Sequence, residues 1–222
     1  MNEIKIDKII RSRRKTISLS VSPEATLTIR APLWISLGYI KSLVFKKRFW
    51  IDKKKQRVLS RGSAVGPKEF IDGEEFFYLG ERYKLRIRDC DEIKLTDELY
   101  FPAKYLPDGR AKMIAWYKKR AREIVAERVD HYSKITGWKF KSLSITGARR
   151  RWGSCSSRDY LNFSFRLAMI PPEVIDYVVA HELAHIPEKN HSARFWNKVE
   201  TVLPDYKMKR RWLRENEGSL KI

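Results

Sequence analysis

The possible structures and functions of this chain are restricted most by two histidines, which lie one helical turn apart in an otherwise apolar segment. Residues 171–187 begin with two prolines and end with a third, so they predict a helix with a sharp start and a sharp end. His181 and His185 are four residues apart and therefore share one face of that helix. Glu182 is rotated from them by about 100°, as the helical repeat requires. Two imidazoles placed in this way can share one metal ion, and Glu182 can reach a water molecule on that ion.

A third metal ligand is expected just after this helix. Pro187 ends the helix, and the five residues before His191 are enough to turn the chain back. His191 directly precedes Ser192, a residue type that often caps the start of a helix, so its position is fixed. A catalytic zinc ion usually has three protein ligands and one open position. The sequence therefore predicts a zinc site with Glu182 as the general base and three imidazole ligands: His181, His185 and His191.

The competing interpretation is purely structural. In it, His181 and His185 form hydrogen bonds in a core and Glu182 lies at the surface. Three of the four histidines in the chain gather in this one segment, which that interpretation leaves unexplained. The fourth, His131, lies alone in a predicted helix and receives no role. The metal site is the favoured interpretation.

The first half of the chain has the pattern of strands with one helix. Apolar residues alternate with polar ones over 17–21 and 27–30, which predicts a hairpin. A helical stripe follows over 36–58, with Ser36 as its N-cap. Residues 61–68 predict a loop, and strands are expected at 76–79, 83–88 and 93–95. We place a domain boundary within 101–109, so residues 1–105 form a basic β-rich domain and 106–222 a second domain.

The second half has the pattern of helices and strands. A long helix begins near Arg110 and ends at Gly137. Strands are expected at 143–145 and 160–167, followed by the histidine helix and a last helix that runs from Ser192 to Leu203. The fold class is therefore α+β, with a β-rich N-terminal region and a C-terminal domain of helices and strands.

The net charge of +20 indicates anionic partners. The excess of Lys and Arg lies in residues 1–60 and 111–222, while 61–110 is slightly acidic. Such a surplus favours nucleic acid or nucleotides, although lysines that are merely solvated give the same composition. Neither a transmembrane run nor a signal peptide is evident, which predicts a cytoplasmic protein without a membrane partner. Cys90 and Cys155 are expected to be reduced thiols.

A basic loop precedes the strand at 160–167. Arg149, Arg150 and Arg151 stand side by side in it and are followed by Trp152. Arginines near a metal site can bind phosphate or a carboxylate, and the indole can stack on a base or pack in the core. A solvated turn with one buried aromatic residue is the equally weighted alternative. Cys155 is interpreted as a structural thiol, since the histidine set already provides three ligands.

Four ordered motifs together resemble the YgjP-like metallopeptidase family, which is similar to the SprT-like proteases. The motifs are RRRWGSCS at 149–156, LNFSFRL at 161–167, PPEVIDYVVAHELAH at 171–185 and NHSARFW at 190–196. The resemblance implies a zincin-like C-terminal domain in which the active-site helix packs on a small sheet, with zinc on the three histidines and Glu182 as the catalytic residue. Metzincins have the same histidine spacing, but this chain has Glu188 where they have a turn glycine. In zincins an edge strand often pairs with an extended peptide, and residues 160–167 are the candidate strand.

Three functions remain open at this point. The first is a zinc metallopeptidase that acts on peptides or proteins. The second is a nucleoside triphosphate pyrophosphatase, in particular for UTP, in which the Arg149–Arg151 cluster binds phosphates. The third is a nucleic-acid-binding protein with a structural zinc, which the basic helix at 36–58 suggests. The residues that bind substrate and stabilise the oxyanion are not identifiable from the sequence.

Overall fold

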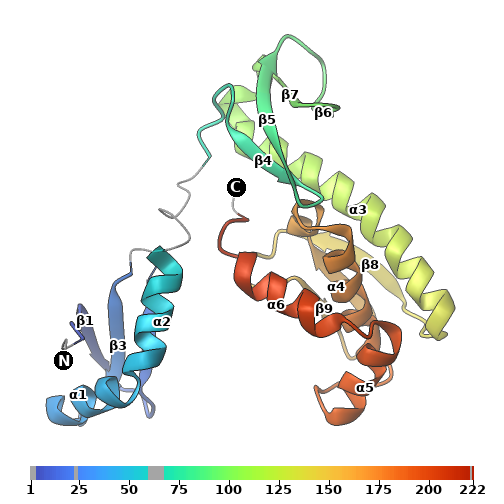
Figure 1. Cartoon of the computed structure of the whole chain (residues 1–222). Coiled ribbons are helices and arrows are strands. Elements are labelled where there is room, and N and C mark those ends of the chain that lie inside the picture. Colours follow the sequence, from blue (N-terminus) through green and yellow to red (C-terminus); the bar gives the residue numbers. More distant parts are fainter. Residues whose placement is uncertain (1–3, 23–24, 60–67, 221) are drawn as a thin grey trace. The chain divides into compact units, whose positions relative to one another are not determined.

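The chain folds into an α+β structure with two compact units, Met1–Gly66 and Pro67–Ile222 (Figure 1). This computed structural model describes residues 4–22, 25–59, 68–220 and 222. Apart from Lys68, the predicted loop at 61–68 lies outside the described residues. Within those ranges, none of the helices combines the length and the apolar character that a membrane span requires.

A three-stranded sheet forms one layer of the N-terminal unit. Strand β3 (Leu27–Pro32) is central, with β1 (Lys8–Ser12) parallel on one side and β2 (Ser18–Val21) antiparallel on the other. The predicted hairpin is therefore confirmed as β2–β3, and β1 is an addition to it. Alternate residues of β3 point into the core, where Leu27 and Ile29 are fully buried.

Two helices provide the rest of this core. Helix α1 (Leu37–Lys46) begins at Ser36, whose Oγ accepts a hydrogen bond of 3.2 Å from the backbone N–H of Tyr39. Helix α2 (Arg48–Leu59) follows after a break at Lys47, so the single helix predicted over 36–58 is in fact two. The break brings both helices onto one aliphatic cluster, which consists of Leu27, Ile29, Ala31, Ile40, Val44 and Ile51.

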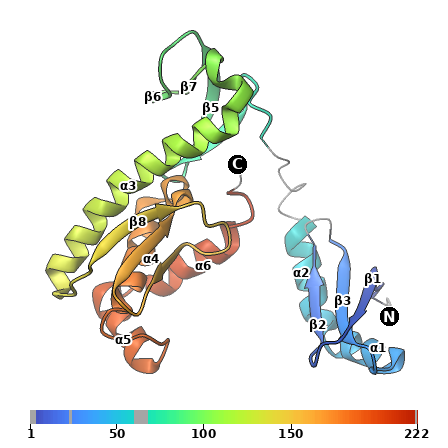
Figure 2. The ribbon, with the colours of Figure 1, turned by 180° about the vertical axis from the view of Figure 1, so that it is seen from behind.

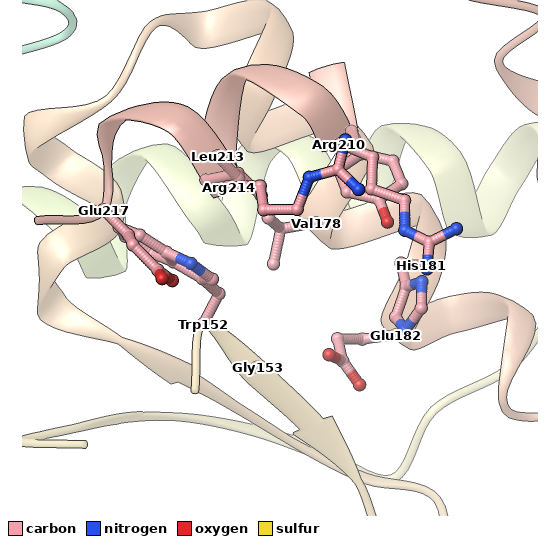
Figure 3. A pocket seen from close by; sticks show the side chains of 10 residues that line it. Trp152, Gly153, Val178, His181, Glu182, Arg210, Leu213, Arg214 and Glu217 are labelled. Carbon is pink, nitrogen blue, oxygen red and sulfur yellow. The ribbon is translucent and has the colours of Figure 1, made fainter. Parts of the chain in front are cut away.

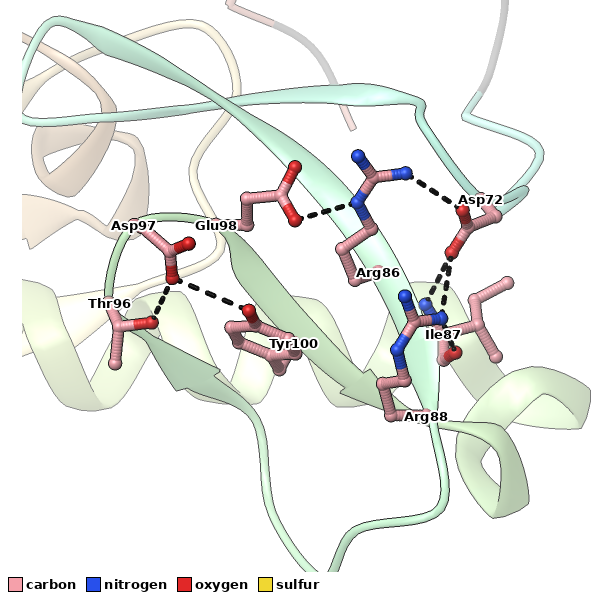
Figure 4. Close-up of polar contacts among 8 residues, drawn as sticks. All are labelled: Asp72, Arg86, Ile87, Arg88, Thr96, Asp97, Glu98 and Tyr100. Atoms are coloured by element: carbon pink, nitrogen blue, oxygen red, sulfur yellow. Dashed lines mark hydrogen bonds and ion pairs between the residues drawn. The ribbon is translucent and has the colours of Figure 1, made fainter.

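The C-terminal unit begins with a four-stranded sheet in the order β4-β5-β7-β6. Its strands are β4 (Glu75–Tyr78), β5 (Glu81–Arg88), β6 (Lys94–Leu95) and β7 (Leu99–Pro102), of which the first three match predicted strands. Arg86 links the parallel pair β5 and β7 to the preceding turn (Figure 4). Its guanidinium group donates to Glu98 at 2.7 Å and to Asp72 at 3.1 Å, which fixes that end of the sheet.

The chain divides at residues 66/67 rather than at the expected 105/106, because the β4–β5 hairpin belongs to the core of the second unit. The backbone N–H groups of Leu79 and Gly80 donate to the carbonyls of Ala168 and Met169, at 2.8 and 3.2 Å. These contacts tie the hairpin to the residues just before the histidine helix. The sequence shows no sign of them, since the partners are almost ninety residues apart.

A 28-residue helix, α3 (Gly109–Thr136), crosses the whole C-terminal unit. It follows a 3-10 segment (Ala103–Asp108) and ends where Gly137 adopts a φ of 72°, as predicted. The second sheet has the order β8-β10-β9, with β8 (Ser142–Thr146), β9 (Gly153–Cys155) and β10 (Tyr160–Ser164). Strand β10 is shorter than the predicted 160–167, because Phe165–Met169 forms a 3-10 turn.

Three helices complete the fold: α4 (Pro172–Ala184), α5 (Ala193–Val202) and α6 (Tyr206–Asn216). Helix α4 contacts α3, α5, α6 and β9, so it is enclosed on most sides (Figure 2). The predicted packing of this helix on a small sheet is confirmed. Helix α6 follows the last predicted helix and was not expected.

A bidentate ion pair joins helices α3 and α4, the two longest helices of this unit. The guanidinium group of Arg128 in α3 donates to both carboxylate oxygens of Asp176 in α4, and both side chains are largely shielded from solvent. We expect Asp176→Ala to destabilise the unit by about 2 kcal/mol, because a charged donor loses both partners. Thermal unfolding should shift by roughly 4–8 °C. Asp130→Ala, which removes an exposed pair with Lys134, is the control and should shift it far less.

Candidate metal centre

Helix α4 presents the first two histidines from inside the domain. Pro172 occupies its first turn, and Val174, Ile175, Val178 and Val179 are buried along its length. His181 lies in its last turn and His185 is its C-cap residue, one turn further on, and their ring centroids are 5.1 Å apart. Most of the helix surface is covered, so the backbone that positions the two imidazoles is rigid.

The third histidine comes back to the same point after the helix ends. The carbonyl of Glu188 lies 3.1 Å from Nδ1 of His185, and Oδ1 of Asn190 accepts the backbone N–H of Ser192 at 3.0 Å. Ser192 in turn caps α5, as expected. With the segment held in this way, Nε2 of His191 lies 3.1 Å from Nε2 of His181.

These three side chains suit a tetrahedral cation. One nitrogen from each lies within 4.8 Å of the others. Two imidazole nitrogens on one tetrahedral zinc ion stand roughly 3.3 Å apart, given zinc–nitrogen distances of about 2.0–2.1 Å. The separation of the His181 and His191 nitrogens is close to that value. Because a carbonyl only accepts, Nδ1 of His185 carries the proton, which leaves the lone pair of its Nε2 free for a ligand.

An aromatic wall from α5 encloses the three imidazoles. The ring of Phe195 lies 4.4–4.9 Å from each histidine ring, and Trp196 stacks on His191 at 5.6 Å. This burial lowers the pKa of His181 to about 3, with the neighbouring histidines as a further cause. His181 is therefore neutral at physiological pH, as a metal ligand must be.

Glu182 lies on the side of α4 that faces β9. Its side chain is only 6 % exposed, which refutes the interpretation that places it at the surface. Burial raises the pKa of its carboxyl group to about 8, while the charge of Arg151 and the backbone N–H of Cys155 act in the opposite direction. A Cβ atom on Gly153 would lie 2.6 Å from Cγ of Glu182, so only glycine leaves room for this carboxylate.

A cavity of about 300 Å³ opens beside Glu182 and His181 (Figure 3). Helix α4 forms its floor, and Trp152 and Gly153 border it from the sheet. The remaining wall is α6, which contributes Arg210, Leu213 and Arg214, together with its C-cap residue Glu217. Sequence reasoning missed these α6 residues, although Tyr206 and Leu213, two turns apart and both buried, are a weak helical signal.

The three arginines of the basic loop lie outside the cavity beside Glu182. Arg149, Arg150 and Arg151 are exposed, and none of them lines the cavity beside Glu182. Trp152 does line it and packs against the core, with the guanidinium carbon of Arg166 at 4.2 Å from the centre of its ring. The three arginines are therefore not part of this cavity, although the charge of Arg151 acts on Glu182.

The expected edge strand is also different. Residues 160–164 form β10, which is the central strand of its sheet, so the prediction that this segment pairs with a substrate is wrong. Strand β9 is at the edge instead and borders Glu182. Its residues sit in the basic loop, where the sequence has no alternation that indicates a strand. A strand of three residues is too short to show one.

Cys155 lies at the end of β9, beside the same site. Its thiol is half-buried, and this burial raises its pKa. Nζ of Lys189 lies 3.2 Å from the carbonyl of Ser156 and also pairs with Asp159. Lys189 therefore ties the segment before His191 to the β9–β10 turn, and Cys155 is not among the clustered ligands.

Comparison with known proteins places this site in a family. The family model described as "YgjP-like, metallopeptidase domain" matches residues 15–216. No curated protein matches the chain. Among solved structures, the metallopeptidase zymogen of Pyrococcus abyssi abylysin is 23% identical, covering 41% of this chain and 93% of its own, with a TM-score of 0.38. Wss1 from Saccharomyces cerevisiae is 21% identical, covering 43% of this chain and 83% of its own, with a TM-score of 0.35.

The family match extends over nearly the whole sequence and includes the three clustered histidines, Glu182 and the strand beside them. Peptide hydrolysis with a divalent metal is the activity of such a domain, and peptides or proteins are its substrates. The chain therefore belongs to the YgjP-like family of metallopeptidase domains.

Proposed function

We propose that the protein is a zinc-dependent peptidase in which His181, His185 and His191 hold the metal and Glu182 is the general base. The observation that carries this proposal is the convergence of three imidazole nitrogens within 4.8 Å beside a buried carboxylate. Three imidazoles favour zinc among the common divalent ions. When bound, zinc would act as a Lewis acid and lower the pKa of a water molecule.

Glu182 has the position and the environment for proton transfer. Its carboxylate borders the cavity next to His181, and burial raises its pKa toward the working pH. In the proposed reaction it accepts a proton from the attacking water and later donates it to the leaving amine. The Cys155 N–H and the charge of Arg151 keep the ionised form accessible.

We infer that the substrate pairs with β9. The carbonyl of Trp152 accepts from Ser164, and the N–H of Ser156 donates to Tyr160, so residues 152, 154 and 156 face β10. Alternate residues of an antiparallel strand face away from the neighbouring strand. The backbone of Gly153 and the carbonyl of Cys155 are therefore left for another chain, while the N–H of Cys155 donates to the Glu182 carboxylate. An extended peptide added at this edge would run past Glu182.

The cavity beside Glu182 suits one side chain of that peptide. Tyr177, Val178 and Leu213 give it an apolar lining, and its charged residues are Arg210 and Arg214 together with Glu182 and Glu217. The guanidinium carbon of Arg210 lies 4.5 Å from the centre of the Trp196 ring, so this side chain has a defined place above the histidines. The combination favours a side chain with an apolar stem and a polar end.

The metal assignment is tested by the metal content of purified protein. Wild type and His131→Ala should each carry about one zinc per chain, because His131 is exposed and distant in sequence from the cluster. His191→Ala should lose most of its zinc while its circular dichroism is unchanged. Full zinc content in the His191 variant, or none in wild type after zinc is added, would contradict the assignment.

The family match is to a metallopeptidase domain and gives no support to the alternative of a UTP pyrophosphatase. The Arg149–Arg151 cluster that suggested phosphate binding does not line the cavity beside Glu182, although Arg210 and Arg214 do. A purely structural zinc site is also a weaker explanation than a catalytic one, because it gives no role to the buried carboxylate of Glu182 beside the histidines. Cytoplasmic placement remains an expectation from the sequence.

A further inference from the structure

The N-terminal unit keeps all of its aromatic side chains on the outside. Residues 1–66 contain five aromatic residues, and each is between 46% and 76% exposed: Trp34, Tyr39, Phe45, Phe49 and Trp50. The core of the unit is entirely aliphatic. Large rings normally provide much of the burial in a small domain, so a set of exposed rings indicates a binding surface.

Two of these rings line a groove with a cationic side chain between them. The groove has a volume of about 1000 Å³ and lies between residues 4–6, α1 and α2. The guanidinium carbon of Arg48 lies 4.3 Å from the centre of the Phe45 ring and 4.5 Å from that of Phe49. Nη1 of Arg48 also donates to the Phe45 carbonyl at 3.1 Å. The three flat groups therefore form one preorganised platform, which we name the Phe45–Arg48–Phe49 platform.

The charge around the platform is strongly positive. Lys5, Lys41 and Arg48 line the groove, against a single acidic residue, Asp52. Over residues 37–59 the sequence has eight Lys or Arg and no acidic residue other than Asp52. A polyanion is the complementary partner. The two rings line a groove in which three cationic side chains also lie, so the site suits flat groups joined to an anionic backbone, whereas insertion into a membrane needs a continuous apolar face.

We propose that this groove binds single-stranded nucleic acid, with bases stacked on Phe45 and Phe49 and phosphates held by Lys5, Lys41 and Arg48. Unpaired bases offer the flat faces that aromatic platforms accept, and a duplex hides them. Basic grooves with interleaved aromatic rings are the general solution for such binding, and they need no base-specific contacts. The proposal does not depend on the metal centre, because every residue in it belongs to the N-terminal unit.

The test uses the full chain with fluorescein-labelled fifteen-residue oligo-dT and oligo-U in anisotropy titrations at several salt concentrations. Phe45→Leu and Phe49→Leu keep apolar bulk and remove the ring, and each should weaken binding by about 5- to 100-fold with the salt slope unchanged. Lys41→Gln removes one phosphate contact, so the slope of log affinity against log salt concentration should become shallower by about 0.7. Leu33→Ala is the matched control, since Leu33 is 59% exposed in the same unit outside the groove. The two oligonucleotides identify whether DNA or RNA is preferred.

Several results would overturn the proposal. If both leucine variants bind with wild-type affinity, the rings do not stack on bases and binding depends on charge alone. If the wild type does not bind at low salt, the groove is not a nucleic-acid site. Tighter capture by vesicles of phosphatidylserine and phosphatidylcholine than by either oligonucleotide would make the surface a membrane contact. Dimerisation that depends on Phe45 and Phe49, seen by light scattering, would make it a protein interface. Circular dichroism of each variant confirms that the fold is retained.

Discussion

Glu182→Gln is expected to lower kcat for peptide hydrolysis by about 10²–10⁴-fold, the usual contribution of a general base. Glutamine has nearly the shape of glutamate, and it fits beside Gly153 without a new atom. It cannot accept a proton from the attacking water, so the loss should appear in kcat rather than in KM. Cleavage of fluorescein-labelled casein by the zinc-loaded protein is the measurement.

The control for this experiment is the same substitution elsewhere on the same helix. Glu173 lies in the first turn of α4 and is exposed, so Glu173→Gln should leave kcat unchanged. Zinc content should be equal in wild type and both variants, since Glu182 is not among the clustered ligands. If Glu182→Gln keeps wild-type kcat with full zinc content, another group moves the proton and the proposed mechanism is wrong.

Local sequence patterns predicted the parts of this fold that depend on neighbouring residues. The helix that carries the histidines has prolines at both ends and an apolar repeat, and all three signals act within a few residues. Helix α3 and its end at Gly137 are predictable for the same reason. The convergence of His191 with the other histidines was also predicted, because only a short turn separates it from the helix.

Pairing between distant segments was not predictable in this way. Strand β10 has the alternation of a half-buried strand, but alternation does not reveal whether a strand is central or at an edge. That depends on β8 and on β9, which has only three residues. The boundary near residue 105 failed similarly, because the hydrogen bonds of Leu79 and Gly80 to Ala168 and Met169 leave no mark on the sequence.

The break between α1 and α2 shows a third kind of limit. A helical stripe continues through Lys47, so periodicity alone predicts one helix. The structure instead ends α1 at Lys46 and begins α2 at Arg48, and both helices contribute to one aliphatic cluster, which includes Ile40 and Ile51. Phe45 and Phe49 stand on the two sides of this break, and the guanidinium group of Arg48 lies over both rings.

Gly153→Ala is expected to reduce kcat by about a hundredfold without loss of zinc. The added methyl group would lie 2.6 Å from Cγ and 2.7 Å from Oε1 of Glu182, far inside van der Waals contact. Strand β9 is held by β10, and α4 is enclosed, so the glutamate side chain must move. A displacement of about 1 Å at a catalytic group is enough for a loss of that size.

Gly147→Ala is the matched control, since a Cβ atom there meets nothing within 4 Å. It should keep wild-type kcat, zinc content and thermal stability. A double-mutant cycle then separates positioning from a general loss of structure. If Gly153 acts only by making room for Glu182, alanine at position 153 should cause little further loss in the Glu182→Gln protein. Additive losses would mean that the strand contributes to catalysis through the substrate instead, by the backbone groups of Gly153 and Cys155.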